Sequence, residues 1–305
     1  MRTTHFKKGV FGYIELIRPF TLLAPIIVSM CIMIASFFQS GKTGDIFNLL
    51  WITILPASFT LAVLNAASNS LNQAADFKAD KISKSYRPLP RGLVTINQAK
   101  TLSVILYFLA FYMSTTINIM FTIFVILIAV FTITYSITPR MKDFLFLNQI
   151  WVAIPRGMLG VLASWSVFAN SLQPVPVTIG FLAMLFLIGG SITKDITDCY
   201  ADKKTGTNTL VNTFGIKKAA FIALPFMFFP FSIVPILIDI GILGSYLWLL
   251  TFLAVPGYFI FYLMIRDDKK SRFLENTSAW TFMYITYFFF AFSFSVLTVL
   301  NSIIS

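Results

Sequence analysis

The sequence predicts an all-α integral membrane protein. Of its 305 residues, 57% are hydrophobic and only 11% are charged, whereas soluble domains carry about a quarter charged residues. Nine apolar stretches are long enough to cross a bilayer, because a spanning helix needs about 20 such residues. We therefore expect nine transmembrane helices, at 18–38, 47–72, 99–116, 117–137, 147–170, 175–195, 217–239, 243–265 and 279–303.

The positive charges predict how these helices are oriented. Connections on one side carry nearly all the Lys and Arg, whereas those on the other side contribute only Lys42. By the positive-inside rule the N-terminus is cytoplasmic, and after nine spans the C-terminus lies outside. The net charge of +11 follows from this topology, so we expect a lipid bilayer and no nucleic acid as partner. The basic segments are the N-terminus, 73–98, 138–146, 196–216 and 266–278.

Three polar residues end the second predicted span at intervals of four. Asn72, Asp76 and Asp80 would share one face of a helix. The two carboxylates would lie about 6 Å apart along the axis, where they repel each other unless a cation lies between them. Mg²⁺ is the hard cation that such oxygen ligands favour.

A second acidic segment repeats this pattern. Asp76 and Asp80 recur 122 positions later as Asp198 and Asp202, and Asp195 lies on the same helix face. We predict a pseudo-symmetric bundle in which both segments reach the cytoplasmic end of a central cavity. Two bland alternatives stay open: a chance match, and a solvated loop whose acids pair with neighbouring lysines.

Basic residues surround the acidic segments. Lys84, Arg87 and Arg91 suit an anion that arrives with metal, since Mg²⁺ bridges carboxylates to phosphate oxygens and Arg or Lys binds the rest. A diphosphate fits best, because it can reach two metal-binding helices. The alternative for each arginine is ordinary cytoplasmic charge.

These motifs resemble those of a known family. Asn72-x3-Asp76-x3-Asp80 followed by the loop Tyr-Arg-Pro-Leu-Pro-Arg-Gly at 86–92, and Lys-Asp-x2-Asp-x3-Asp-x3-Gly from Lys194, are similar to the two aspartate-rich loops of the UbiA superfamily of intramembrane prenyltransferases. The resemblance implies one domain over residues 1–305, with the loops at about 72–92 and 194–210. It also implies Mg²⁺ as cofactor and an isoprenyl diphosphate as substrate.

The resemblance assigns roles to individual residues. Tyr135 and the acids Asp76, Asp80, Asp198 and Asp202 are implied to be catalytic. Gln73 departs from the pattern, because many members carry an aspartate there. The implied metal ligands are Asn72, Asp76, Asp80, Asp195, Asp198 and Asp202, and the implied diphosphate contacts are Arg18, Asn72, Lys84, Arg87, Arg91 and Lys142.

Other polar residues within the spans have two interpretations each. Tyr135 either faces the allylic carbon, where its ring stabilises positive charge, or belongs to an interfacial belt. Arg156, inside the fifth span, is a candidate acceptor or diphosphate contact, since intramembrane arginines face cavities. Asn65 and Asn69 either line the cavity or bond neighbouring helices.

The function we expect is Mg²⁺-dependent transfer of a prenyl group to a membrane-associated acceptor. Candidate acceptors are geranylgeranylglyceryl phosphate, which the second motif's resemblance to archaeal members implies, and an aromatic quinone precursor. Chlorophyllide-like acceptors are an alternative, as is a transporter that uses the buried acids. The acids lie at helix ends and not at the midplane, which favours the enzyme. Acceptor, prenyl length and oligomeric state stay open.

Overall fold

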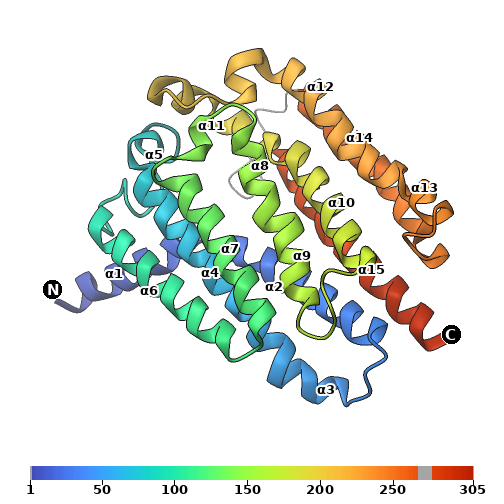
Figure 1. Cartoon of the computed structure of the whole chain (residues 1–305). Coiled ribbons are helices and arrows are strands. Elements are labelled where there is room, and N and C mark those ends of the chain that lie inside the picture. The colour runs from blue at the N-terminus through green and yellow to red at the C-terminus, as the bar shows by residue number, and fades with distance from the viewer. Residues whose placement is uncertain (1, 267–276, 305) are drawn as a thin grey trace.

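The chain folds into a bundle of helices that run between two ends of the molecule (Figure 1). The computed structural model describes residues 2–266 and 277–304, and every regular element in these ranges is helical. The first half comprises α1 (Arg2–Ile17), α2 (Pro19–Gln39), α3 (Ile46–Leu49), η1 (Leu50–Ile54), α4 (Leu55–Ala75), α5 (Phe77–Ser83), α6 (Ile96–Thr115) and α7 (Ile119–Ser136).

The second half is more interrupted than the first. A π-helical turn, η3, separates α8 from α9, and a 3-10 segment, η4, precedes α14. The elements are η2 (Met141–Asp143), α8 (Leu147–Ala153), η3 (Ile154–Met158), α9 (Leu159–Trp165), α10 (Pro174–Gly190), α11 (Ile192–Thr205), α12 (Leu210–Ser232), α13 (Val234–Asp239), η4 (Ser245–Leu253), α14 (Ala254–Arg266) and α15 (Ser278–Ile304).

Seven stretches of the described chain are long and apolar enough to cross a membrane, so the prediction of nine spans is confirmed only in part. The two remaining predicted spans correspond to α6 and to α8–η3–α9. Both are helical, but α6 begins with polar residues and the other contains Arg156 and the π-turn. The seven stretches are Pro19–Gln39, Ile46–Ala75, Ile119–Ser136, Pro174–Thr205, Leu210–Asp239, Ser245–Arg266 and Ser278–Ile304.

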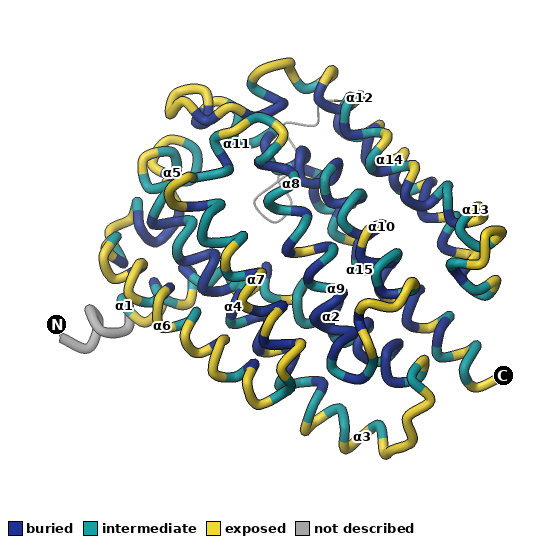
Figure 2. The backbone as a smooth tube through the Cα atoms, viewed as in Figure 1, coloured by how far each residue is buried: buried dark blue, intermediate teal, exposed yellow. Residues whose placement is uncertain are grey.

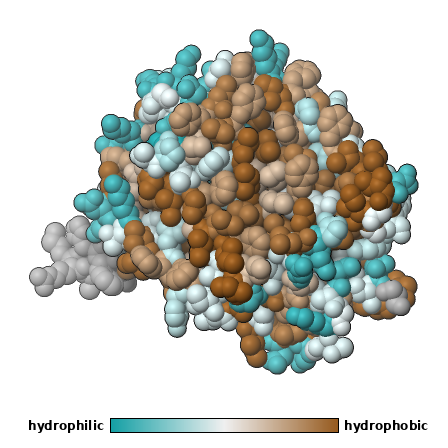
Figure 3. Space-filling model, in the orientation of Figure 1, coloured by the Kyte–Doolittle hydropathy of each residue, from teal (hydrophilic) through white to brown (hydrophobic). Residues whose placement is uncertain are grey.

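The outer surface is apolar. Phe108, Tyr112 and Phe221 expose 70%, 68% and 60% of their surface, and Figure 3 shows such residues across the middle of one face, with hydrophilic residues toward the ends. An apolar surface of this extent needs a partner, and the long apolar helices make that partner a lipid bilayer. The basic segment 266–278 lies almost entirely outside the described residues.

The interior is closely packed, with buried backbone concentrated in the centre of the bundle (Figure 2). The fully buried aromatic side chains Trp165, Phe231 and Phe294 join α9, α12 and α15. Contacts between helices depend on small residues: a Cβ added to Gly189 of α10 would lie 2.6 Å from the carbonyl oxygen of Ala223 in α12. This packing surrounds a cavity whose lining includes residues of α5 and α11.

Candidate active site

A cavity runs between α2, α4, α7, α8, α11 and α15, and its lining includes every predicted site residue except Arg91. The two acidic segments meet at one end of it, because α5 packs against α11. Both are found at the same end of the bundle (Figure 1). The cavity lining also includes apolar and aromatic residues, among them Leu61, Ile128 and Trp280.

The first acidic segment is bent at Asp76. Its backbone (φ −93°, ψ 11°) separates α4 from α5, so the predicted stripe lies on two helices and not on one. The hydrogen bonds continue across the bend: the Asp76 amide donates to Asn72 O over 2.8 Å, and the Asp80 amide donates to Asp76 O over 2.9 Å. Asn72, Asp76 and Asp80 therefore all keep their place in the cavity lining.

Asp76 is paired with two cations from the segment after α7. Lys142 Nζ lies 2.5 Å from one carboxylate oxygen and an Arg140 guanidinium nitrogen lies 2.9 Å from the other. Burial raises the pKa of the Asp76 carboxyl, but Lys142 and Arg140 outweigh this effect, and the pKa lies below its usual value. The carboxylate is therefore held ionised.

Asp80 is paired with Arg87. One guanidinium nitrogen donates to both carboxylate oxygens, over 2.9 and 2.8 Å, and both residues are buried. The loop after α5 turns back on itself, as the hydrogen bond from the Arg87 amide to Lys84 O shows. Arg87 therefore reaches Asp80 of α5. Burial raises the pKa of the Asp80 carboxyl despite Arg87.

An ion pair joins the two acidic segments. Lys84, just after α5, donates from Nζ to Asp198 Oδ2 of α11 over 2.6 Å. The other oxygen, Asp198 Oδ1, is buried and has no hydrogen-bond partner among the residues that the structure describes. Burial lowers the pKa of the Lys84 ammonium. Lys84 thus bridges the two sides of the cavity where we predicted a diphosphate.

The other two acids of α11, Asp195 and Asp202, have no ion pair as short as that between Lys84 and Asp198 in the described part of the chain. Gln149 Nε2 donates to Asp195 Oδ2 over 3.1 Å, while Lys194 Nζ is 3.9 Å from Asp195 Oδ1. Asp202 is buried and lines the cavity. Across from them, Gln73 lines the cavity and donates from Nε2 to Leu16 O over 2.6 Å. The residue that departs from the family pattern therefore ties α4 to α1.

The donor set has the chemistry of a Mg²⁺ site, since it consists of carboxylate and amide oxygens and includes the unpartnered Asp198 Oδ1. Within the ranges that the structure describes, however, no three acidic, thiol or imidazole side chains converge on one point. Lys142, Arg87 and Lys84 pair with three of the acids instead. A metal ion bound by these carboxylates would replace the three cations as their partner.

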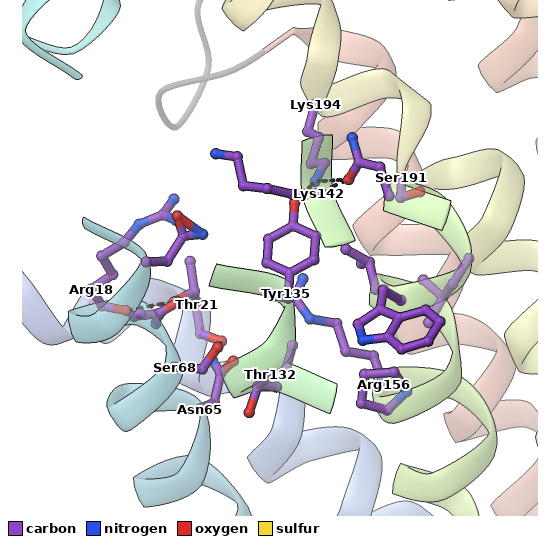
Figure 4. A pocket seen from close by; sticks show the side chains of 18 of the residues that line it. Arg18, Thr21, Asn65, Ser68, Thr132, Tyr135, Lys142, Arg156, Ser191 and Lys194 are labelled. Carbon is purple, nitrogen blue, oxygen red and sulfur yellow. Dashed lines mark hydrogen bonds between the residues drawn. The ribbon is translucent and has the colours of Figure 1, made fainter. Parts of the chain in front are cut away.

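Tyr135 forms a network with Lys194 and Asn148. Lys194 Nζ donates to the Tyr135 hydroxyl over 2.7 Å, and this hydroxyl donates to Asn148 Oδ1 over 3.1 Å. Figure 4 shows the Tyr135 side chain inside the cavity, with its hydroxyl toward Lys194 and Lys142. Tyr135 is thus a cavity residue and not an interfacial belt residue.

Three residues of the site were missed by the sequence predictions. Lys194, Asn148 and Gln149 all line or support the cavity through the hydrogen bonds above. The sequence does contain features that could have identified them. Lys194 directly precedes Asp195, and the polar pair Asn148–Gln149 lies in an apolar stretch. Their partners lie 13 to 59 positions away, so the sequence alone does not identify the contacts.

Of the other residues that the sequence pointed to, Arg91 lies away from the cavity, whereas Arg18, Asn65 and Asn69 line it. Arg91 lies outside the cavity lining and pairs with Glu15 over 2.9 Å, so its position gives no support to the predicted diphosphate contact. Arg18 lines the cavity at the start of α2. Asn65 and Asn69 do both things proposed for them: they line the cavity, and their amides donate to Thr21 O and Ile17 O.

Comparison with known families matches residues 25–291 to the UbiA prenyltransferase family. The chain belongs to this family. Digeranylgeranylglyceryl phosphate synthase of Methanosphaera stadtmanae is 26% identical over 260 residues, which are 85% of this chain and 89% of the relative. The protein is accordingly a prenyltransferase, as the resemblance of its two aspartate motifs implied.

Solved structures share the fold. One of digeranylgeranylglyceryl phosphate synthase is 23% identical with a TM-score of 0.64, covering 97% of this chain and 99% of the other. A UbiA homologue from Archaeoglobus fulgidus, bound to DMAPP and Mg²⁺, is 17% identical with a TM-score of 0.68, covering 94% of this chain and 98% of the other.

Proposed function

We propose that this UbiA-family enzyme transfers a prenyl group from an isoprenyl diphosphate to a prenylated glyceryl phosphate in the membrane, with Mg²⁺ as cofactor. One observation carries the proposal: two acidic segments, linked by Lys84 and Asp198, lie at one end of a cavity that is also lined by apolar and aromatic side chains. A diphosphate suits the charged end and an isoprenoid tail suits the apolar and aromatic side chains. The relative's name favours the glyceryl phosphate over a quinone precursor or a chlorophyllide.

One amide and five carboxylates of the two segments would hold Mg²⁺: those of Asn72, Asp76 and Asp80 on one side, and of Asp195, Asp198 and Asp202 on the other. When bound, Mg²⁺ neutralises the diphosphate charge and so favours its departure. The binding of a solved UbiA homologue to Mg²⁺ together with DMAPP supports this assignment.

The cations of the site would change partners when substrate binds. Lys84, Arg87 and Lys142 now neutralise carboxylates, and all three reach the cavity. With those carboxylates holding Mg²⁺, Lys84, Arg87 and Lys142 would be available to donate to phosphate oxygens. Arg87 is suited to this role, since a guanidinium matches phosphate geometry.

The reaction is a substitution at the allylic carbon C1. The bond from C1 to the diphosphate oxygen breaks and the diphosphate keeps the electron pair. A lone pair of the acceptor hydroxyl oxygen forms the new bond to C1, and that oxygen loses its proton to the released diphosphate. Positive charge that develops at C1 is stabilised by an aromatic face, for which Tyr135 is the candidate, and the apolar cavity excludes water.

The membrane topology is also a proposal. We infer nine spans, with α6 and α8–η3–α9 included, a cytoplasmic N-terminus, an external C-terminus and an active site that faces the cytoplasm. In Figure 1, α5 and α11 lie at the end opposite to α3 and to the connection between α6 and α7. This arrangement agrees with the distribution of Lys and Arg along the chain.

The test is incubation of the purified protein in detergent with a radiolabelled isoprenyl diphosphate, Mg²⁺ and candidate acceptors. We expect product with a prenylated glyceryl phosphate, and loss of at least 100-fold in rate for Asp76→Asn and Asp198→Asn. Asp239→Asn is the matched control, because Asp239 is an exposed carboxylate at the end of α13. Full activity in both site variants, or solute uptake without chemistry in liposomes, would overturn the proposal.

A further inference from the structure

Arg156 differs from the other cations around the cavity. Lys84, Lys142 and Lys194 each make a short contact with a polar or acidic partner. The Arg156 guanidinium makes no hydrogen bond or ion pair within the described part of the chain, although the residue lies midway along α8–η3–α9. Its side chain is exposed to the cavity while its neighbours Pro155 and Gly157 are buried.

The backbone around Arg156 is fixed from two sides. It lies in the π-turn η3 (Ile154–Met158), and such turns are often found at functional sites. The Tyr287 hydroxyl of α15 donates to the Arg156 carbonyl over 2.8 Å. On the opposite side, a Cβ added to Gly157 would lie 2.5 Å from the Met184 amide of α10. The turn is thus held between α10 and α15, with the arginine directed into the cavity.

Arg156 lies deeper in the cavity than the acidic segments. Asn148, which contacts Tyr135 and Lys194, precedes it by eight residues, or about 12 Å along a helix axis. Figure 4 shows the Arg156 side chain extending into the cavity on the far side of the Tyr135 hydroxyl from Lys194. The lining of the same cavity also includes the aromatic residues Trp151, Trp280 and Tyr284.

We propose that Arg156 binds the phosphate of the acceptor, which makes it a determinant of acceptor specificity. This inference rests on the proposed function and deepens it. With the donor diphosphate at the acidic segments, a nucleophile that approaches C1 from the face opposite the leaving group must lie deeper, toward Arg156. A charged headgroup placed there needs a partner, because an unpaired charge in an apolar cavity is strongly disfavoured.

The same geometry explains why the arginine is left unpaired. A guanidinium already joined to a carboxylate would offer the acceptor little, whereas one held only by its backbone offers a planar fork of donors that matches a phosphate. The enzyme would then separate its two anions: the donor diphosphate at the acidic segments with metal, and the acceptor phosphate at Arg156 without it.

The test compares two acceptors, a geranylgeranylglyceryl phosphate and the neutral geranylgeranylglycerol. For Arg156→Gln we expect KM for the phosphorylated acceptor to rise about 10- to 100-fold, because a charge-assisted hydrogen bond to the phosphate is lost. KM for the neutral acceptor and for the isoprenyl diphosphate should stay unchanged. Arg156→Lys should recover part of the affinity. Arg266→Gln, at the exposed end of α14, is the matched control.

Acceptor binding is measured as well as turnover, so that a failure of the proposed prenyl transfer can be distinguished from a failure of the proposed role of Arg156. Quenching of tryptophan fluorescence on addition of each acceptor, with Trp151 and Trp280 in the lining, reports acceptor affinity without any reaction. Selective loss of phosphorylated-acceptor binding in Arg156→Gln supports the proposal even if wild type transfers no prenyl group. Equal losses for both acceptors, a raised KM for the isoprenyl diphosphate alone, or unchanged binding would each overturn it.

Discussion

The Lys194 ammonium lies 2.7 Å from the Tyr135 hydroxyl, and the same nitrogen is 5.1 Å from the centre of the tyrosine ring. It therefore sits beside the hydroxyl, at the ring edge, and does not cover the aromatic face. Asn148 accepts a hydrogen bond from the hydroxyl, so the ring is fixed from α8 and α11 together. Lys194 therefore leaves the ring faces uncovered, and we infer that it is a positioning residue for Tyr135.

Lys194→Met is expected to lower kcat about tenfold, the effect of about 1.4 kcal/mol on the barrier, with little change in KM for the isoprenyl diphosphate. If Lys194 acts through Tyr135, a double-mutant cycle shows it: Lys194→Met in a Tyr135→Phe background should cost little more than Tyr135→Phe alone. Lys194→Arg should retain part of the rate. A direct diphosphate contact would instead raise KM equally in both backgrounds.

Mg²⁺ and the isoprenyl diphosphate are expected to stabilise the protein together and not singly. Three of the site carboxylates are already neutralised by Lys142, Arg87 and Lys84, so Mg²⁺ alone gains little by binding. If the metal–diphosphate complex is treated as one ligand at a hundred times its Kd, the stabilisation is about 2.7 kcal/mol.

Thermal unfolding followed by intrinsic fluorescence checks this prediction. The Tm should rise clearly only when both ligands are present, and EDTA should reverse the rise. Asp198→Asn should lose the joint effect, whereas Asp239→Asn should keep it. A shift with Mg²⁺ alone as large as the joint shift would mean that a complete metal site exists before substrate binds.

Much of the fold and of the site follows from the sequence. The apolar stretches locate the helices, since spanning helices must satisfy their own backbone. The four-residue spacing in 72–80 and 195–202 identifies the acidic segments, and both do meet at one cavity. Local spacing suffices here because side chains four apart share a helix face.

Contacts between helices could not be predicted in the same way. Nothing near Asp76 in the sequence indicates that Lys142 and Arg140 neutralise it, 66 and 64 positions away. Arg91 lies four residues after Arg87 in the same loop, yet it pairs with Glu15 and does not line the cavity. The order in which helices pack decides such pairs, and that order is a property of the whole chain.

The nine-span topology predicts which residues a membrane-impermeant maleimide reaches in intact cells. In a background with Cys31 and Cys199 replaced by alanine, Lys42→Cys, Thr116→Cys and Asn170→Cys should be labelled from outside. Thr116 and Asn170 are exposed and lie beyond the ends of α6 and α9, so they test the two spans that composition alone leaves open. Lys204→Cys should react only after permeabilisation. If Thr116→Cys, like Lys204→Cys, is labelled only after permeabilisation, α6 does not cross the membrane.

Gly189→Ala tests how closely α10 and α12 must approach. Its new Cβ would lie 2.6 Å from the Ala223 carbonyl oxygen and 2.9 Å from the Met227 side chain, and the carbonyl is backbone that cannot rotate away. Overpacking of this kind costs about 1–3 kcal/mol, which we expect as a lower midpoint of unfolding in detergent. Gly9→Ala is the control, because no atom lies within 4 Å of its added Cβ and alanine favours a helix. If Gly189→Ala unfolds at the wild-type midpoint, α10 and α12 can separate without cost, and the wall of the cavity that α10 supports is more adaptable than its packing indicates.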